Sequence, residues 1–125
     1  MPAYRPEEIH SLLADAFNRA DLDAFVDAHE EGAVTVVPPA GARARGRREI
    51  RAAMEPIFAL RPTVVNEVLE TLESGDLALT QARWSLSGTS SGGETVELDG
   101  EGTVVSRRQP DGTWRIVMEN PVRPA

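Results

Sequence analysis

The sequence predicts an α+β fold in which three N-terminal helices pack on a long curved antiparallel sheet, and three observations support it. Apolar residues recur at helical spacing as far as about residue 60. From Thr63 onward they alternate as strands require, and Gly- and Asp-containing turns typical of hairpins separate the alternating runs. The length of 125 residues fits one hydrophobic core, so we interpret residues 1–125 as a single domain.

The first two helices are predicted from their starting residues and apolar stripes. Pro6-Glu7-Glu8 suits a first helical turn, because Pro lacks the N–H that has no partner there and the helix dipole favours acids. One apolar stripe follows at helical spacing, formed by Ile9, Leu12, Leu13, Ala16 and Phe17. Asp21 is expected to cap a second, shorter helix that Gly32 ends.

The rest of the chain is predicted as one short strand, one helix and four long strands. Residues 33–37 form a β-branched run that Pro38-Pro39 ends. A third helix over about 47–60 follows the loop from Gly41 to Gly46. The long strands are expected near 63–73, 77–89, 95–109 and 113–120, with Gly88, Gly100 and Gly102 as bulge or kink points.

Composition excludes several kinds of chemistry. The chain has no Cys and no Lys, which removes disulfides, thiolate nucleophiles and Schiff-base catalysis. It has two His, so a metal site would need several carboxylates, and we expect neither a metal nor a cofactor. The net charge of −7 disfavours nucleic acid as a partner. No run is long and apolar enough for a membrane span, and no signal peptide is recognisable, so we expect a cytoplasmic protein that binds no membrane.

A curved sheet covered by helices encloses a pocket, because its concave face is too wide for its own side chains to fill. In the last strand, Trp114, Ile116, Met118 and Asn120 share one face, which we expect to be concave. Arg115, Val117 and Glu119 share the other face. One face of the second long strand carries Ala78, Thr80, Ala82, Trp84 and Leu86.

Four motifs give the chain a resemblance to a known family. They are Phe17-Asn-Arg-Ala-Asp21, Val37-Pro-Pro39, Gly46-Arg-Arg-Glu-Ile50, and Asp111-Gly-Thr-Trp-Arg-Ile-Val117 with Asn120-Pro-Val-Arg. Their order over about residues 8–123 resembles the nuclear transport factor 2-like superfamily, the cone fold of ketosteroid isomerases and SnoaL-like polyketide cyclases. Within it, the motifs resemble the SgcJ/EcaC-type branch, which is mostly of unassigned function.

The resemblance also implies what this chain lacks. It places Pro38 where the family's general base sits, Leu13 at the oxyanion-hole Tyr, and about Val104 at the protonated Asp. A steroid-isomerase reaction that uses those three groups is therefore disfavoured.

The candidate ligand-binding residues follow from the expected concave face. Asn120 is positioned to hydrogen-bond a ligand, or else it caps the end of its strand. Trp84, Trp114 and Met118 form either walls of the ligand site or plain core. From the helices, Phe17 and Phe58 complete the set.

The charged residues are predicted to be less informative. We expect His10 and His29 to be solvated at helix edges, and Glu119 to pair with Arg115 on the convex face. The acids at 97, 99 and 101 indicate an exposed or interfacial face, although a carboxylate pair on facing strands, or one acting with Asn120, is able to activate water. The Arg run over 43–51 is interpreted as a solvated loop and first helical turn that is able to pair with the acidic helices.

Two functional hypotheses result. The first is a protein with a pocket for a small apolar molecule; as an enzyme, the resemblance implies a cofactor-independent isomerase, cyclase or hydrolase of polyketide-like metabolites. The second is a non-catalytic interaction module that uses the convex sheet face. The charges expected on that face, from Arg83, Arg107, Arg115 and Glu119, suit a polar interface. A homodimer through the convex face is compatible with both hypotheses, and we expect one.

Overall fold

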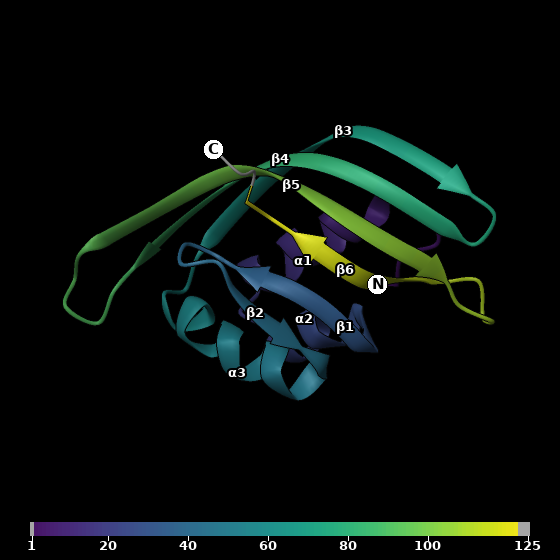
Figure 1. Ribbon diagram of the computed structural model, residues 1–125. Helices are drawn as coiled ribbons and strands as arrows, with labels where there is room; N and C mark the ends of the chain where they lie inside the picture. The colour runs from purple at the N-terminus through teal and green to yellow at the C-terminus, as the bar shows by residue number, and fades with distance from the viewer. Residues whose placement is uncertain (1, 123–125) are drawn as a thin grey trace.

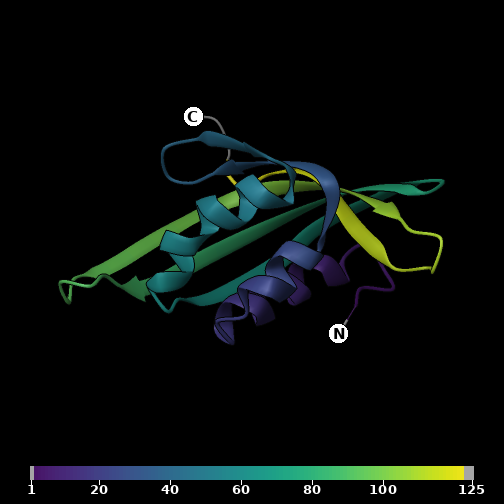
Figure 2. The same cartoon turned by 90° about the horizontal axis from the view of Figure 1, so that it is seen from below.

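The computed structural model describes residues 2–122, and its helices lie on one side of a six-stranded sheet (Figures 1 and 2). Residues 1 and 123–125, among them Arg123 of the last motif, lie outside the described residues. The helices and strands are α1 (Glu8–Asn18), α2 (Leu22–Asp27), β1 (His29–Val37), β2 (Ala42–Arg45), α3 (Gly46–Ala59), β3 (Thr63–Ser74), β4 (Leu77–Thr89), β5 (Thr95–Arg108) and β6 (Trp114–Asn120). This is the α+β fold that the sequence predicts.

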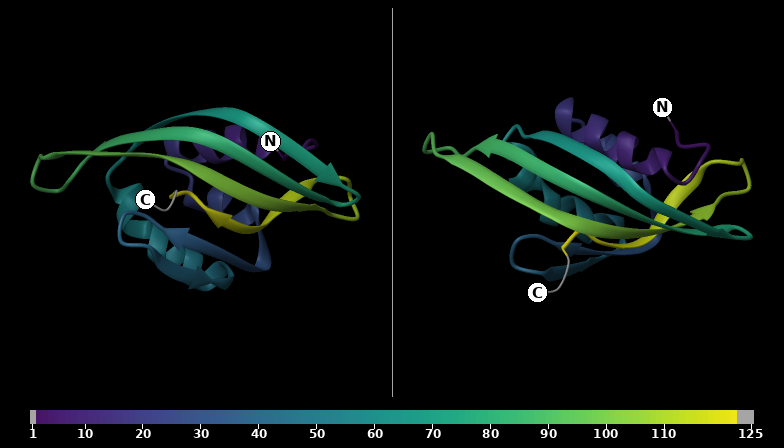
Figure 3. Two further views of the ribbon diagram at one scale, coloured as in Figure 1. Left: turned by 45° about the horizontal axis from the view of Figure 1, so that its top comes forward. Right: turned by 90° about the horizontal axis from the view of Figure 1, so that it is seen from above.

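The sheet has the strand order β2-β1-β6-β5-β4-β3 and is mixed rather than purely antiparallel. From β3 to β6 it is the predicted antiparallel meander, and the long strands end within one residue of the predicted bounds. The strand β1, however, runs parallel to β6. Figure 3 shows the long strands bending around the helices. The segment expected to be a loop between Gly41 and Gly46 contains β2, which pairs with β1.

The prediction that Gly32 ends the second helix is wrong. The capped helix begins as expected, since the Asp21 carboxylate accepts from the backbone N–H of Ala24 at 3.0 Å. It ends at Asp27, and Gly32 lies inside β1. The reason is pairing with β6: the Ala28 carbonyl accepts from the Ile116 N–H at 2.8 Å, so the chain is already extended at His29.

The hydrophobic core lies between the helices and the concave side of the sheet. The apolar stripes of α1 and α3 point into it as predicted, with Ile9, Ala16 and Ile50 fully buried. Between α1 and α3, Phe17 stacks on Phe58 with ring centroids 4.8 Å apart. Such aromatic pairs add to the stability that buried area already provides.

A bulge in β6 reverses which residues face the helices. Ser106 pairs with Ile116 and Val105 pairs with Met118, so Val117 has no partner opposite it on β5. One extra residue shifts the alternation of a strand by one position. Up to the bulge the inner residues are Trp114 and Ile116, as predicted, whereas beyond it the inner residue is Glu119.

The predicted concave placement of Met118 and Asn120 is therefore wrong. Met118 is 51% exposed on the outer side of the sheet. Asn120 is exposed, and its Oδ1 accepts from the Val122 N–H at 3.1 Å. Asn120 thus caps the end of its strand, which is the second of the two interpretations offered above.

The segment after β6 crosses over two glycines of β5. A Cβ at Gly102 would lie 2.7 Å from Cα of Pro121, and one at Gly100 would lie 3.1 Å from the Pro121 carbonyl oxygen. The indole N–H of Trp84 donates to that carbonyl at 2.7 Å. These glycines were predicted as kink points, but what requires them is the close approach of this backbone. No helix among residues 2–122 is long and apolar enough to span a membrane.

Candidate functional site

A cavity of about 100 Å³ lies between the helices and the concave face of the sheet. Its walls are mostly apolar and come from all three helices and from the long strands. Phe17 and Phe25 line it from the helical side, and Trp84 and Leu98 line it from the sheet. The predicted pocket therefore exists, and its position agrees with the prediction.

The six residues predicted to bind a ligand lie in different places. Trp84 and Phe17 line the cavity. Phe58 packs behind Phe17, and Trp114 is buried in the core with the Arg108 guanidinium 5.6 Å from its ring. Met118 and Asn120 lie on the outer side of the sheet, as described above. Contact of Trp84 and Phe17 with a ligand stays a prediction.

Glu119 is the charged group of the cavity. It lines the cavity from β6, and its side chain is 8% exposed. His29, fully buried at the start of β1, lies with its Nε2 2.7 Å from Oε1 of Glu119. The other ring nitrogen of His29, Nδ1, donates to the Phe25 carbonyl at 2.8 Å. Both nitrogens thus face acceptors, the arrangement of a doubly protonated ring beside a carboxylate.

The pKa of Glu119 lies below its ordinary value. Burial acts to raise this pKa, because it penalises the charged form. The hydrogen bond and positive charge of His29 and a hydrogen bond from Thr35 act in the opposite direction, and the net shift of this pKa is downward. Glu119 is therefore ionised at neutral pH although it faces an apolar space.

His10 is the second titratable group that lines the cavity. It is 5% exposed, and its Nε2 lies 2.6 Å from Oγ1 of Thr80, which is fully buried. Burial lowers the pKa of His10, and the charge of Glu119 only partly opposes that effect. His10 is therefore neutral near pH 7. Asn66 fixes the backbone at this point, since its Nδ2 donates to the His10 carbonyl at 2.7 Å.

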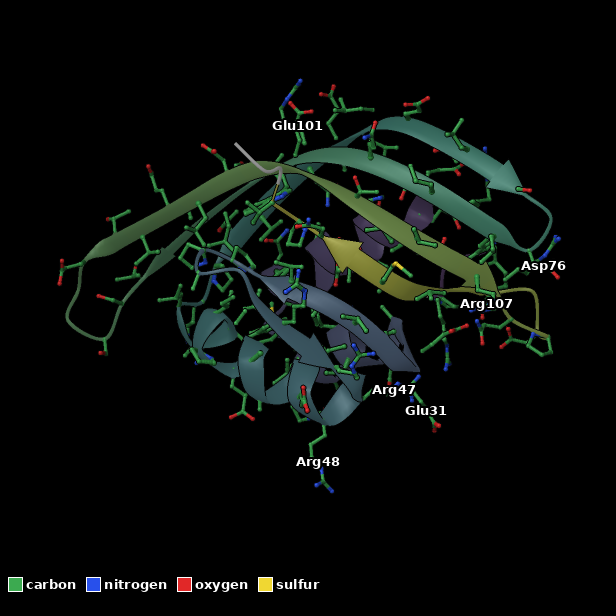
Figure 4. All side chains as sticks on the ribbon, viewed as in Figure 1. Glu31, Arg47, Arg48, Asp76, Glu101 and Arg107 are labelled. Atoms are coloured by element: carbon green, nitrogen blue, oxygen red, sulfur yellow. The ribbon has the colours of Figure 1, made fainter. Side chains whose placement is uncertain are left out.

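An arginine from α3 holds the start of β1. Nε and Nη2 of Arg47 both donate to the His29 carbonyl, at 2.9 and 2.7 Å. Arg51 pairs with Asp23 of α2 at 2.7 Å, while Arg48 points away from the fold (Figure 4). The expected pairing with an acidic helix is confirmed for Arg51, and the expected solvation is confirmed for Arg48. The prediction of solvation is wrong for Arg47, which fixes the backbone of a site residue.

The predictions of a surface Glu119 and of solvated histidines are also wrong. The signal for His10 was present, because His10, Leu13 and Phe17 follow one another at i, i+3 and i+7. His29 likewise lies four residues after Phe25. No comparable signal existed for Glu119, because its inward direction depends on the bulge at Val117.

The three positions at which the resemblance implied a loss all line the cavity. Pro38, Leu13 and Val104 present apolar atoms to it. The titratable groups that line this cavity, Glu119 and His10, come from other elements, namely β6 and α1. Within residues 2–122, no three His, Cys, Asp or Glu side chains gather as a metal site would require.

Comparison with known proteins identifies the family. The model of the SnoaL-like domain matches residues 10–117. The chain belongs to the SnoaL-like family. No curated protein matches this SnoaL-like chain.

Solved structures support the SnoaL-like fold. A ketosteroid isomerase-like protein from Erwinia carotovora atroseptica SCRI1043 is 19% identical, with 94% of each chain covered and a TM-score of 0.77. A conserved protein from Planctomyces limnophilus DSM 3776 is 14% identical, over 93% of this chain and 91% of that one, with a TM-score of 0.80. A nuclear transport factor 2-like superfamily protein from Salmonella enterica serovar Typhimurium LT2 is 18% identical, over 94% and 87%, with a TM-score of 0.79. At such identities the likeness shows the fold alone.

The SnoaL-like cavity of this chain therefore combines apolar walls with an ionised carboxylate and a neutral imidazole. The carboxylate of Glu119 accepts hydrogen bonds or a proton, and His29 behind it supplies the compensating charge. A site of this kind is suited to binding a small molecule and to moving a proton on it.

Proposed function

We propose that the protein binds a small, largely apolar molecule in this cavity and transfers a proton on it without a cofactor, as an isomerase, cyclase or hydrolase. The observation that carries the proposal is the ionised Glu119 facing an apolar space, with His29 2.7 Å behind it. Burying a carboxylate is costly unless it is paired and hydrogen-bonded. A paired carboxylate that still lines a cavity is the arrangement of a functional site.

The direction of the Glu119 pKa limits the chemistry. A carboxylate with a lowered pKa is a weak base, and general-base catalysis is most effective when the pKa lies near the working pH. The proposal therefore applies to substrates whose proton is itself acidic, such as an enolic or phenolic hydroxyl or a C–H between two carbonyl groups. Polyketide-like metabolites contain such groups, which is consistent with a place in the SgcJ/EcaC-type branch.

The size of the cavity favours a small ligand over a polycyclic one. Sites for drug-sized ligands usually have volumes of about 300–1,000 Å³, whereas this cavity has about 100 Å³. Within the polyketide-like class, the volume supports a substrate of one ring or an equally small acyclic chain.

Filling the cavity tests the proposal. Ala14 lines the cavity from α1, so Ala14→Leu places extra side-chain atoms in it without weakening the helix. We expect small aromatic probes such as toluene to raise the thermal unfolding temperature of the wild type and to lose that effect in this variant. The matched control is Ala52→Leu on the exposed side of α3. No stabilisation of the wild type, or equal stabilisation of both variants, would refute binding in the cavity.

A second candidate function, self-association through the outer sheet face, is favoured by a separate observation. An apolar row crosses that face with its members directly opposite one another on neighbouring strands. It consists of Leu72, Leu79, Val105, Met118 and Val34. Leu72 is 55% exposed and Met118 is 51% exposed. Contiguous exposed apolar surface of this kind commonly marks an interface.

Charge at the two ends of the row supports a second copy of the chain as the partner. Arg45 of β2 lies opposite Val34 at one end, and Glu70 lies two residues before Leu72 at the other. A two-fold axis through the middle of the row would bring each basic end against an acidic one. Of the four charges expected at a polar interface on this face, Glu119 does not contribute, because it faces inward.

Sedimentation tests self-association. We expect the wild type to sediment as a dimer and Met118→Glu to sediment as a monomer, because the new charge would be buried without a partner. The control is Tyr4→Glu, at a side chain that is 62% exposed outside the sheet. A monomeric wild type would refute the dimer without affecting the cavity proposal.

A further inference from the structure

The polar groups of the cavity place a stricter requirement on the ligand than its apolar walls do. Glu119 lines the cavity as a carboxylate, which accepts hydrogen bonds and donates none. Its two oxygens accept up to about four hydrogen bonds, and His29 and Thr35 supply two. The remaining acceptor capacity is available to a ligand that donates.

His10 supplies the complementary group. Thr80 is fully buried, and among residues 2–122 its hydroxyl has no hydrogen-bond partner other than Nε2 of His10. The hydroxyl hydrogen is satisfied only if Thr80 donates to Nε2, because a buried donor without an acceptor is costly. A neutral ring that accepts at Nε2 carries its own hydrogen at Nδ1. Nδ1 has no hydrogen-bond partner in the described part of the chain, which leaves an N–H donor on a side chain that lines the cavity.

We propose that the ligand is a small neutral molecule with a hydroxyl group, which donates to Glu119 and accepts from Nδ1 of His10. This inference rests on the proposed function and names its substrate class. A hydroxyl donates and accepts at a single atom, whereas carbonyl and carboxylate oxygens only accept and an ammonium group only donates. The charges of His29 and Glu119 already compensate each other, so an ion brought into the cavity would be buried without a counter-charge.

The volume sets the size of this hydroxyl compound. An apolar protein cavity of about 150 Å³ accommodates benzene, so a cavity of about 100 Å³ limits the ligand to one small ring at most. Because the proposed function requires an acidic proton, the matching class is a small phenol or enol, and Trp84 and Phe17 line the cavity with flat apolar surfaces.

A matched pair of probes separates this inference from the proposed function. Phenol and toluene have the same number of non-hydrogen atoms and differ in the hydroxyl. We expect phenol to bind the wild type at least about tenfold more tightly than toluene in an NMR titration, because a hydrogen bond to a charged group is among the stronger ones. Benzoate, which only accepts, should not bind. Glu119→Gln should lose most of the preference for phenol, whereas the exposed control Glu55→Gln should keep it.

The possible outcomes test the hydroxyl inference and the proposed apolar binding cavity separately. If toluene binds as tightly as phenol, or if the preference survives in Glu119→Gln, the hydroxyl inference is wrong and the apolar pocket stands. If neither probe binds, both proposals fail. A measurement on the wild type alone removes any dependence on the folding of a variant: phenol, but not toluene, should shift the ¹⁵N resonance of His10 Nδ1. An unchanged resonance at saturating phenol would overturn the inference.

Discussion

His10 and His29 are both buried, at 5% and 0% exposure, but they differ in how many of their ring nitrogens are hydrogen-bonded to the described part of the protein. His29 has an acceptor at each nitrogen, the Phe25 carbonyl and the Glu119 carboxylate. Among the described residues the His10 ring has one hydrogen-bond partner, Thr80, and it also lines the cavity. The first ring lies behind the carboxylate, and the second lies beside the space that a ligand would occupy.

The difference indicates separate tasks for the two rings. A ring with both nitrogens bound to protein groups is fixed in place and has no free atom for a ligand, so His29 positions Glu119 and maintains its charge. A ring with a free nitrogen at a cavity wall is available for contact with a ligand. Variants that separate stability from binding therefore test this division.

Removing His29 should cause the largest loss of stability. His29→Leu would leave the Glu119 carboxylate buried without its partner, and breaking a buried ion pair in this way costs about 3–5 kcal/mol. Urea denaturation would measure the loss. The double variant His29→Leu/Glu119→Leu should recover much of it, because it removes the unpaired charge as well. A loss below about 1 kcal/mol in the single variant would contradict a positioning role for His29.

Removing His10 should cause a smaller loss of stability than removing His29. His10→Leu would leave the Thr80 hydroxyl without a partner, a penalty of about 1–3 kcal/mol. Thr80→Val removes the same hydrogen bond from the other side. In a double-mutant cycle, the two substitutions together should cost less than the sum of their separate effects. Strict additivity would show that the 2.6 Å contact contributes nothing to stability.

The pH dependence of stability should separate His10 from Glu119. The folded-state pKa of His10 lies below 6.5, so between that pKa and 6.5 the unfolded chain binds more protons and stability falls as pH falls. The Glu119 carboxylate makes its full contribution to the free energy of unfolding above pH 4.5. That contribution is lost as the pH falls through the lowered folded-state pKa of Glu119. His10→Leu/Thr80→Val should therefore remove the decline that starts near 6.5 and retain the one below 4.5. Urea unfolding at a series of pH values measures both declines in stability. If the decline that starts near pH 6.5 is unchanged in the double variant, His10 is not buried and neutral.

The sequence was sufficient to predict the elements that depend on local patterns. The stripes of α1 and α3 follow the helical period, and the strands from β3 to β6 are separated by hairpin turns, so local spacing alone determines where they begin and end. The grouping of Ala78, Thr80 and Ala82 on one face of β4 was also correct, since all three are buried. The start of β1 was missed because it depends on pairing with β6, which is distant in the sequence.

The site itself was mostly missed, for a similar reason. One unpaired residue, Val117, exchanges the sides of Met118 and Glu119, and nothing in the residues of β6 marks the bulge. If the bulge is ignored, the alternation along β6 places Glu119 on the outer side of the sheet and Met118 on the inner side. The two histidines were missed because polar residues at the edge of an apolar stripe are assigned to solvent by default, although a buried partner such as Thr80 or Glu119 reverses that assignment.

The smallest expected effect concerns a second buried hydroxyl, which sharpens the comparison of the rings. Ser106 is fully buried on β5, and its Oγ has no hydrogen-bond partner among the described residues, whereas Thr80 on the neighbouring strand has His10. Ser106→Ala should therefore leave stability unchanged or raise it by up to about 1 kcal/mol, because it removes a buried polar group that gains nothing from folding. Urea denaturation beside Thr80→Val provides the contrast, since that variant should lose stability. A loss above about 1 kcal/mol in Ser106→Ala would show that this hydroxyl has a bonding partner in solution.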